Sequence, residues 1–285
     1  MKRFNIELDV HLNPLANSVP VSSAVKSYKR QRREDDAAAH PALDVALHTC
    51  IISGRQCRSR IGLSSHLTIH QLDSLEEVDL LQAIAVPFAD SSTQYFVTGF
   101  DGFPAFGFKV GASIKHPYRL FMPERFYRRF SIMIAMKPDT VSPMFVFAVT
   151  NPLENIIQLG VGFIPADQGM SNVSLYYTDG ERHMTSQTIA SFLVPQFVGS
   201  WSRLAFSVTE EDIQLWYNCE LYSDVLVKRV PLQLVFDSAS TLYIGQAGGI
   251  FKGDFEGALQ ELKIYNDPSL AKVQCDDSFT VSTSL

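Results

Sequence analysis

Short runs in which apolar and polar residues alternate recur along most of the chain from residue 95 onward. In the run 130–137 every second residue, beginning with Phe130, is large and apolar, which is the period of a strand with one buried face. Similar runs occupy the ranges 106–114, 144–149, 156–163, 173–178, 201–208, 213–218, 221–230, 242–244 and 262–264. Turn signals such as Asn151-Pro152 separate them. The pattern predicts an all-β fold, an antiparallel β-sandwich with jelly-roll character.

One segment before these strands has a different period. Ser74 and Glu77 form the pattern of a capping box, and apolar residues follow at helical spacing until Pro87. The sequence therefore predicts a short N-terminal α-helix over 74–85, packed on the sheet. The folded domain is expected to begin here.

Residues 1–71 show no persistent period, and they are expected to form a flexible or poorly structured N-terminal arm. The arm contains the basic run Lys-Arg-Gln-Arg-Arg at 29–33, followed at once by acids. A solvated charge block is the simplest interpretation, and a furin-type cleavage site or an import-like signal are the alternatives. At the other end, residues 276–285 are acidic and rich in Ser and Thr, as at the start of a linker.

The four cysteines are even in number, as two disulfide bonds would require. Cys50 and Cys57 precede His66 and His70, but their spacing departs from that of a zinc finger. Leu67 stands where a zinc protease of the His-Glu-x-x-His type carries its Glu. A local disulfide or two free thiols are therefore expected at Cys50 and Cys57, zinc remains a minor alternative, and no metal site is assigned.

Composition narrows the class of function. The chain has 285 residues, 46% of them hydrophobic and 19% charged, which suits a globular core. Its net charge of −6 argues against binding nucleic acid through the whole surface, and no apolar run is long enough for membrane insertion. The motifs of serine hydrolases, phosphate-binding loops and dinucleotide folds are missing. We therefore expect that the protein is not an enzyme and that it binds no cofactor.

Basic residues are concentrated in one segment of this acidic chain. Between residues 109 and 137 a single acid, Glu124, faces seven basic residues: Lys109, Lys115, Arg119, Arg125, Arg128, Arg129 and Lys137. Such a segment is a candidate binding site for a polyanion. The alternative is that the three arginines from 125 to 129 pair with acids elsewhere in the fold.

Three stretches of the chain carry a family resemblance. They are ASFLVPQFVGSWSRLAFSV at 190–208, LWYNC at 215–219 and FEGALQELKI at 255–264. They resemble the laminin-G-like, thrombospondin N-terminal-type domain. The motif QAGG at 246–249 and the run 193–208 are similar to that domain in the multiplexin collagens, types XV and XVIII. The resemblance covers about residues 72–275.

The resemblance implies a sandwich of 12 to 14 strands in which Cys219 and Cys275 form a disulfide. Closing so long a loop would stabilise the fold by roughly 4 kcal/mol in the chain-entropy model. Disulfides persist outside the reducing cytosol, so the resemblance implies a protein secreted into the extracellular matrix. The N-terminus lacks the apolar core of a signal peptide and taken literally indicates a cytosolic start, so we expect an incomplete or mis-started chain.

The resemblance also implies a function. It indicates a non-catalytic structural and cell-adhesion module of basement membrane, the N-terminal non-collagenous domain of a multiplexin-like collagen, with heparan sulfate as partner. A collagenous trimer is expected only if Gly-X-Y repeats follow, and Asn172 of Asn172-Val173-Ser174 is a glycosylation candidate in a secreted chain. The main alternative is a lectin-like carbohydrate-binding protein, because the same architecture hosts lectins. An intracellular zinc-dependent regulator is a third, and it requires free thiols at Cys219 and Cys275.

Overall fold

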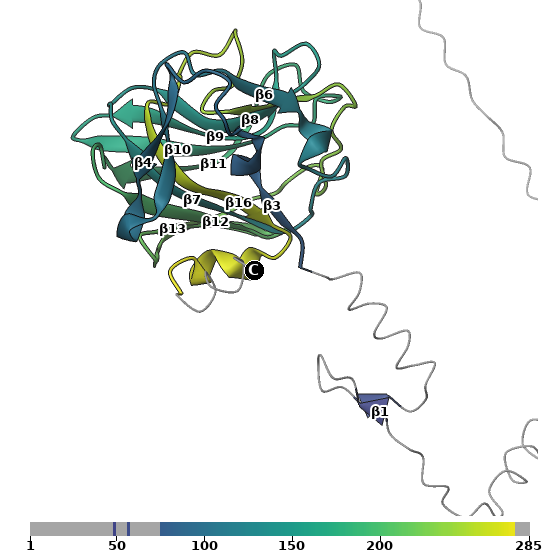
Figure 1. The fold of residues 1–285 in the computed structure, drawn as a ribbon. Coiled ribbons are helices and arrows are strands. Elements are labelled where there is room, and N and C mark those ends of the chain that lie inside the picture. The colour runs from purple at the N-terminus through teal and green to yellow at the C-terminus, as the bar shows by residue number, and fades with distance from the viewer. Residues whose placement is uncertain (1–47, 50–55, 58–74, 277–285) are drawn as a thin grey trace, which may run out of the picture. The chain divides into compact units, whose positions relative to one another are not determined.

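The computed structural model describes residues 48–49, 56–57 and 75–276 (Figure 1). The chain divides into two units, Met1–Asp73 and Ser74–Leu285. The predicted limits of the arm, the folded domain and the linker stay predictions.

In the first unit, strand β1 (His48–Thr49) pairs antiparallel with strand β2 (Gln56–Cys57), and His48 lies opposite Cys57 in the register. Several predictions fall outside the described residues: the basic run at 29–33, Cys50, His66, His70 and the linker residues 277–285.

The second unit contains a six-stranded antiparallel sheet. Its strands are β6 (Ile114–Pro117), β8 (Met144–Thr150), β9 (Ile157–Ala166), β10 (Met170–Tyr177), β11 (Thr188–Pro195) and β15 (Thr241–Ile244). They lie in the order β11-β10-β9-β8-β15-β6. Strands β8 to β11 form a meander, and β15 inserts between β8 and β6 although it is distant from both in sequence.

An eight-stranded antiparallel sheet packs against the first. Its strands are β3 (Glu77–Asp79), β4 (Gln94–Thr98), β5 (Pro104–Phe108), β7 (Phe130–Pro138), β12 (Ser202–Val208), β13 (Asp212–Tyr217), β14 (Glu220–Leu226) and β16 (Gly257–Tyr265). They lie in the order β14-β13-β12-β7-β16-β5-β4, and β3 also pairs with β16. The described residues also contain four 3₁₀ turns: η1 (Leu80–Ala83), η2 (Phe100–Gly102), η3 (Tyr118–Leu120) and η4 (Pro268–Val273).

The core lies between the two sheets and is formed by alternate residues of their strands. Ile132 and Ile134 of β7 and Leu159 and Val161 of β9 are all fully buried and belong to one apolar cluster. Burial of these side chains is the main term that stabilises such a sandwich. The prediction of an all-β antiparallel sandwich is confirmed.

The predicted α-helix over 74–85 is wrong. In its place the chain forms the short strand β3 and the 3₁₀ turn η1. Strand β3 pairs with β16, and the Glu77 carboxylate forms an ion pair with Lys263 Nζ at 2.8 Å. Sheet pairing supplies the backbone partners that a helix would have supplied, so the tertiary contacts override the local helical spacing.

Two predicted strands have different limits in the structure. The range 106–114 is divided into β5 and β6, which lie in different sheets, and Gly111 between them has a φ of 86° that favours glycine. The range 221–230 ends as a strand at Leu226. Strands β4 and β11 were not among the predicted strands, although residues 190–195 of β11 belong to a stretch that carries the family resemblance.

Candidate binding surfaces

The C-terminal strap, residues 268–275, lies across the outer face of the eight-stranded sheet, where Figure 1 shows it as a yellow coil beside β12 and β13. Its turn η4 packs on β7 and β12. Leu270 and Ala271 of the strap form an apolar cluster with Met133 and Ala205 of the sheet. The strap therefore buries the face of β7 that points away from the core.

A disulfide bond joins Cys219 to Cys275 at the end of the strap. Cys219 lies in the tight turn between β13 and β14, where Asn218 and Cys219 have φ values of 47° and 76°. Positive φ at both central residues is typical of the type I′ turn of β-hairpins. The two Cα atoms are 5.8 Å apart, within the usual range for a disulfide. The bond ties the strap to the tip of the β13–β14 hairpin.

Glu261 of β16 lies beneath the strap. Gln274 is 4% exposed, and its Nε2 donates hydrogen bonds to Glu261 Oε2 at 2.7 Å and to the Ile134 carbonyl oxygen at 3.1 Å. Burial raises the pKa of the Glu261 carboxyl, and the hydrogen bond from Gln274 opposes that rise. The strap thus covers a carboxyl group as well as apolar surface.

The seven basic residues of the predicted polyanion site are distributed over several elements. Lys109 follows β5, and its Nζ lies 5.7 Å from the centre of the Tyr95 ring. Lys137 is a partly buried residue of β7 and lies opposite Ala258 of β16. Arg125 pairs through its backbone with Val235 in an isolated bridge. Lys109 and Lys137 lie on either side of the same end of β16, because their chain neighbours Phe108 and Pro138 both pair with Gly257. Arg125 pairs with a different segment.

Lys115 and Arg119 line the same hollow. Lys115 lies on β6, at the edge of the six-stranded sheet, and Arg119 lies in η3 directly after it. The hollow has a volume of about 600 Å³ and is also lined by Glu154. Both basic residues are exposed, and neither side chain forms an ion pair or hydrogen bond within the described part of the chain. Lys115 and Arg119 are thus two exposed cations of the predicted segment that share one hollow.

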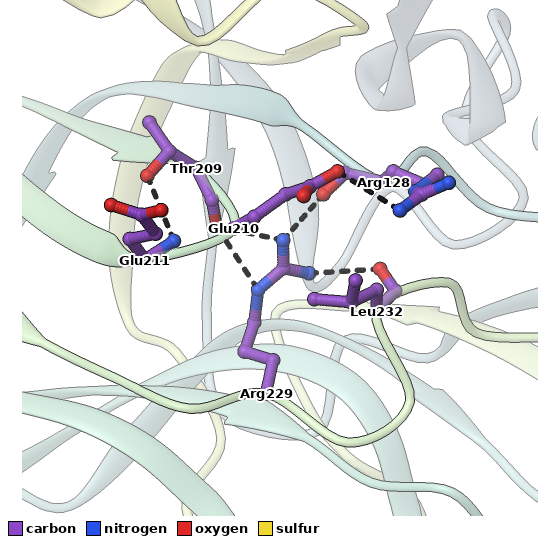
Figure 2. Close-up of polar contacts among 6 residues, drawn as sticks. All are labelled: Arg128, Thr209, Glu210, Glu211, Arg229 and Leu232. Carbon is purple, nitrogen blue, oxygen red and sulfur yellow. Dashed lines mark hydrogen bonds and ion pairs between the residues drawn. The ribbon is translucent and has the colours of Figure 1, made fainter.

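Arg128 and Arg129 face acidic residues at another end of the sandwich. Arg128 Nη2 lies 3.1 Å from Glu210 Oε1, and the two side chains are 56% and 43% exposed (Figure 2). Arg129 lines a hollow together with Glu210, Glu211 and Asp212. Arg128 therefore pairs with an acid, as the alternative to a polyanion site expected, and acids also lie beside Arg129.

Arg229 is a buried cation that sequence reasoning missed. It is 3% exposed, and its guanidinium donates to the carbonyl oxygens of three loops (Figure 2). The acceptors are Thr209 O, at 3.2 Å from Nε and 2.7 Å from Nη2, Leu232 O, at 3.2 Å from Nη1, and Arg128 O. The fork of donors on arginine suits this convergence. Arg229 holds the three loops together at this end of the sandwich.

The aromatic ring of Tyr177 covers the same guanidinium, whose carbon lies 5.1 Å from the ring centre. Burial raises the pKa of Tyr177 to about 12, and the nearby charge of Arg229 opposes that rise. Burial likewise lowers the pKa of Arg229, and Tyr177 opposes that shift. No sequence motif surrounds Arg229, so only the fold identifies it as a structural residue.

Comparison with known proteins identifies the relatives of the folded part. Over an aligned region of 205 residues, the chain is 33% identical to the human collagen alpha-1(XVIII) chain. The aligned region is 71% of this chain and 11% of that collagen. The chain is a homologue of collagen XVIII. The predicted family resemblance is thereby confirmed, and the β-sandwich is a collagen XVIII-like non-collagenous module. The chain spans only 11% of the collagen that it matches.

No family model matches this collagen XVIII homologue. Among solved structures, domain 4 of the arabinanase AbnA from Geobacillus stearothermophilus, in complex with arabinotriose, is 17% identical with a TM-score of 0.46, covering 70% of this chain and 86% of that one. Domains LG4-5 of the mouse laminin alpha1 chain are 13% identical with a TM-score of 0.39, covering 56% of this chain and 40% of that one.

Asn172, the glycosylation candidate of this chain, lies on β10 between Ile164 of β9 and Leu193 of β11. Its side chain is partly exposed, and its Oδ1 accepts a hydrogen bond from Ser191 Oγ at 2.7 Å. Glycosylation of Asn172 stays a prediction.

Within the described ranges no group of three or more His, Cys, Asp and Glu side chains is arranged to hold a metal ion. The same part of the chain contains no helix with the length and hydrophobicity to cross a lipid bilayer.

Proposed function

We propose that the chain is a non-catalytic adhesion module of the extracellular matrix, and that its β-sandwich binds heparan sulfate. The homology to a collagen supports the matrix setting. The Cys219–Cys275 disulfide supports an oxidising, extracellular compartment. Attachment to other matrix molecules, rather than catalysis, is the work that such a module performs.

The observation that carries heparan sulfate binding is the pair Lys115 and Arg119 on one hollow. A sulfate group offers several acceptor oxygens, and the planar guanidinium of arginine can donate to two of them at once. Lysine adds a compact positive charge beside it. Because neither side chain has an acidic partner within the described residues, both are available to a sulfated sugar.

Glu154 is the acid that lines this hollow. It lies against the Tyr243 hydroxyl, and burial together with Glu154 raises the pKa of that tyrosine. The two cations outnumber the single acid, and the hollow keeps a positive balance.

Heparin chromatography of the full chain at stepped salt concentrations tests the proposal. The wild-type protein is expected to elute above the physiological ionic strength of about 0.15 M, and the Lys115→Ser/Arg119→Ser variant below it. Arg128→Ser/Arg129→Ser is the matched control, because it removes the same number of charges where acids already face them. Wild-type elution below about 0.15 M salt, or equal losses in the two variants, would contradict the proposal.

A further inference from the structure

Another hollow lies at one end of the sandwich, and none of the basic residues discussed above lines it. It has a volume of about 290 Å³. The start of β9, the loop after β10 and the loop before β15 enclose it. Its polar lining includes Gln158, Asp179, Gln233 and Asp237.

The floor of this hollow holds the Gln158 side chain, whose amide N–H groups have no protein acceptor among the described residues and lie open to the hollow. Gln158 is 2% exposed, and its Oε1 accepts a hydrogen bond from Ser240 Oγ at 2.6 Å. Its Nε2 has no hydrogen-bond partner in the described part of the chain. A Cβ placed on Gly180 at the rim would lie 3.5 Å from this Nε2. The missing side chain at position 180 therefore leaves the donor open to the hollow, where an acceptor on a ligand would satisfy it.

The other polar groups of the hollow are mostly acceptors. Asp179 is oriented by Arg182, whose Nε lies 3.1 Å from its Oδ2, and by the Glu181 backbone N–H, which donates to its Oδ1 at 3.1 Å. The carboxylate of Asp237 lies on the opposite loop. A ligand that meets these carboxylates and the Gln158 amide must both donate and accept hydrogen bonds, and hydroxyl groups do both.

The same lining argues against two other ligands. A metal ion would face the N–H of Gln158, which repels a cation, whereas metal sites of this kind use oxygen atoms. A sulfate would face the carboxylates of Glu181 and Asp237 without a basic residue in the lining. Pro231 and Val235 add apolar surface, against which the C–H face of a sugar ring can pack.

The walls of the hollow are fixed before any ligand arrives. Arg229 donates to Leu232 O at 3.2 Å, next to Pro231 (Figure 2). Further along the same loop, Phe236 N donates to Glu124 O at 3.0 Å, and Ser240 N donates to Asp237 O at 3.0 Å. A preformed site loses little conformational entropy on binding.

We propose that this hollow binds one neutral sugar unit, a hexose or an N-acetylhexosamine. The inference goes beyond heparan sulfate binding, because it uses different residues and the opposite charge. It gives the sandwich a second carbohydrate site at the Gln158 end.

Saturation-transfer difference NMR on the full chain, with the methyl glycosides of glucose, galactose, mannose and N-acetylglucosamine as probes, tests the proposal. At least one probe is expected to bind the wild-type protein. Gly180→Ala places a methyl group at ordinary contact distance over Gln158 Nε2, so we expect it to weaken binding about tenfold or more without disturbing the fold. Asp237→Asn is expected to weaken the same probe and also to leave folding intact, because Asp237 is exposed.

Gly249→Ala is the matched control, because a Cβ there has nothing within 4 Å, and it should bind as the wild type does. Heparin elution should be unchanged in Gly180→Ala, which separates this site from the one at Lys115 and Arg119. Three results overturn the proposal: none of the four probes binds, Gly180→Ala binds as tightly as wild type, or EDTA abolishes binding and so identifies a cation site.

Discussion

The disulfide between Cys219 and Cys275 makes a prediction about stability that can be worked out from the structure. Replacing both cysteines by serine removes a bond between residues that are 56 positions apart. Cys219 is exposed and Cys275 partly buried, so the serines leave no large cavity in the core. The substitution therefore acts chiefly on the unfolded chain, which regains the freedom that the bond had removed.

The size of the effect follows from the loop length. In the chain-entropy model a closed loop of about 56 residues lowers the entropy of the unfolded chain by about 14 cal/mol/K, or about 4 kcal/mol at 25 °C. A domain of this size loses about 2–4 °C of Tm for each kcal/mol. We therefore expect the double variant to melt about 8–16 °C below the wild-type protein.

Urea denaturation and calorimetry of the full chain measure both quantities. The comparison is best made with Cys50→Ser and Cys57→Ser in both proteins, so that no free thiol can exchange with the bond. Wild-type protein treated with a reductant should reproduce the double variant. The slope of the unfolding free energy against urea should rise in the variant, because its unfolded chain is less compact.

Two results would refute this reasoning. A loss of stability below about 1 kcal/mol would show that the bond does not constrain the unfolded chain as the model requires. A large loss with an unchanged urea slope, accompanied by faster hydrogen exchange in the β13–β14 hairpin, would place the effect in the packing of the strap.

Three further substitutions give distinct outcomes. Gly257→Ala should lower the free energy of unfolding measured in urea by about 3 kcal/mol or more, because Gly257 has a φ of 143° and an added Cβ would collide with the Lys137 carbonyl oxygen. Gly249→Ala is the control and should leave the free energy of unfolding unchanged, because a Cβ there has nothing within 4 Å. Equal stability of the two variants would contradict this prediction. Arg229→Met should lower the unfolding free energy by about 3 kcal/mol or more, since it strips three loop carbonyls of their donor, and a change below about 1 kcal/mol would contradict that role. The raised pKa of Glu261 means that its stabilising contribution is present below the ordinary value of 4.5 and is lost as pH rises through the folded-state pKa. Glu261→Gln should therefore flatten the fall of stability over that pH interval, and an unchanged pH profile would count against it.

Much of the fold could be predicted from the sequence, because a strand with one buried face leaves a local signature. The alternation beginning at Phe130 identifies the side chains of β7 that join the core between the sheets, although the strap also buries the other face of this strand. The two strands at 242–244 and 262–264 were found by the same period. The pairing of Cys219 with Cys275 was implied by the family resemblance, and the sequence pattern alone left other pairings open.

The tertiary structure decided what depends on contacts between distant segments. The segment near Glu77 has helical spacing, yet pairing with β16 makes it a strand, because an existing strand offers more backbone partners than one isolated helical turn. The basic segment is continuous in sequence, but its strands and turns carry Lys115 and Arg128 to different surroundings, one open and one paired. Arg229 and Gln158 are single polar residues without any motif, and only the loops that converge on them make one a structural clamp and the other an open donor. A period along the chain specifies which face is buried, whereas the partners of a buried polar group are set by the packing of the whole sandwich.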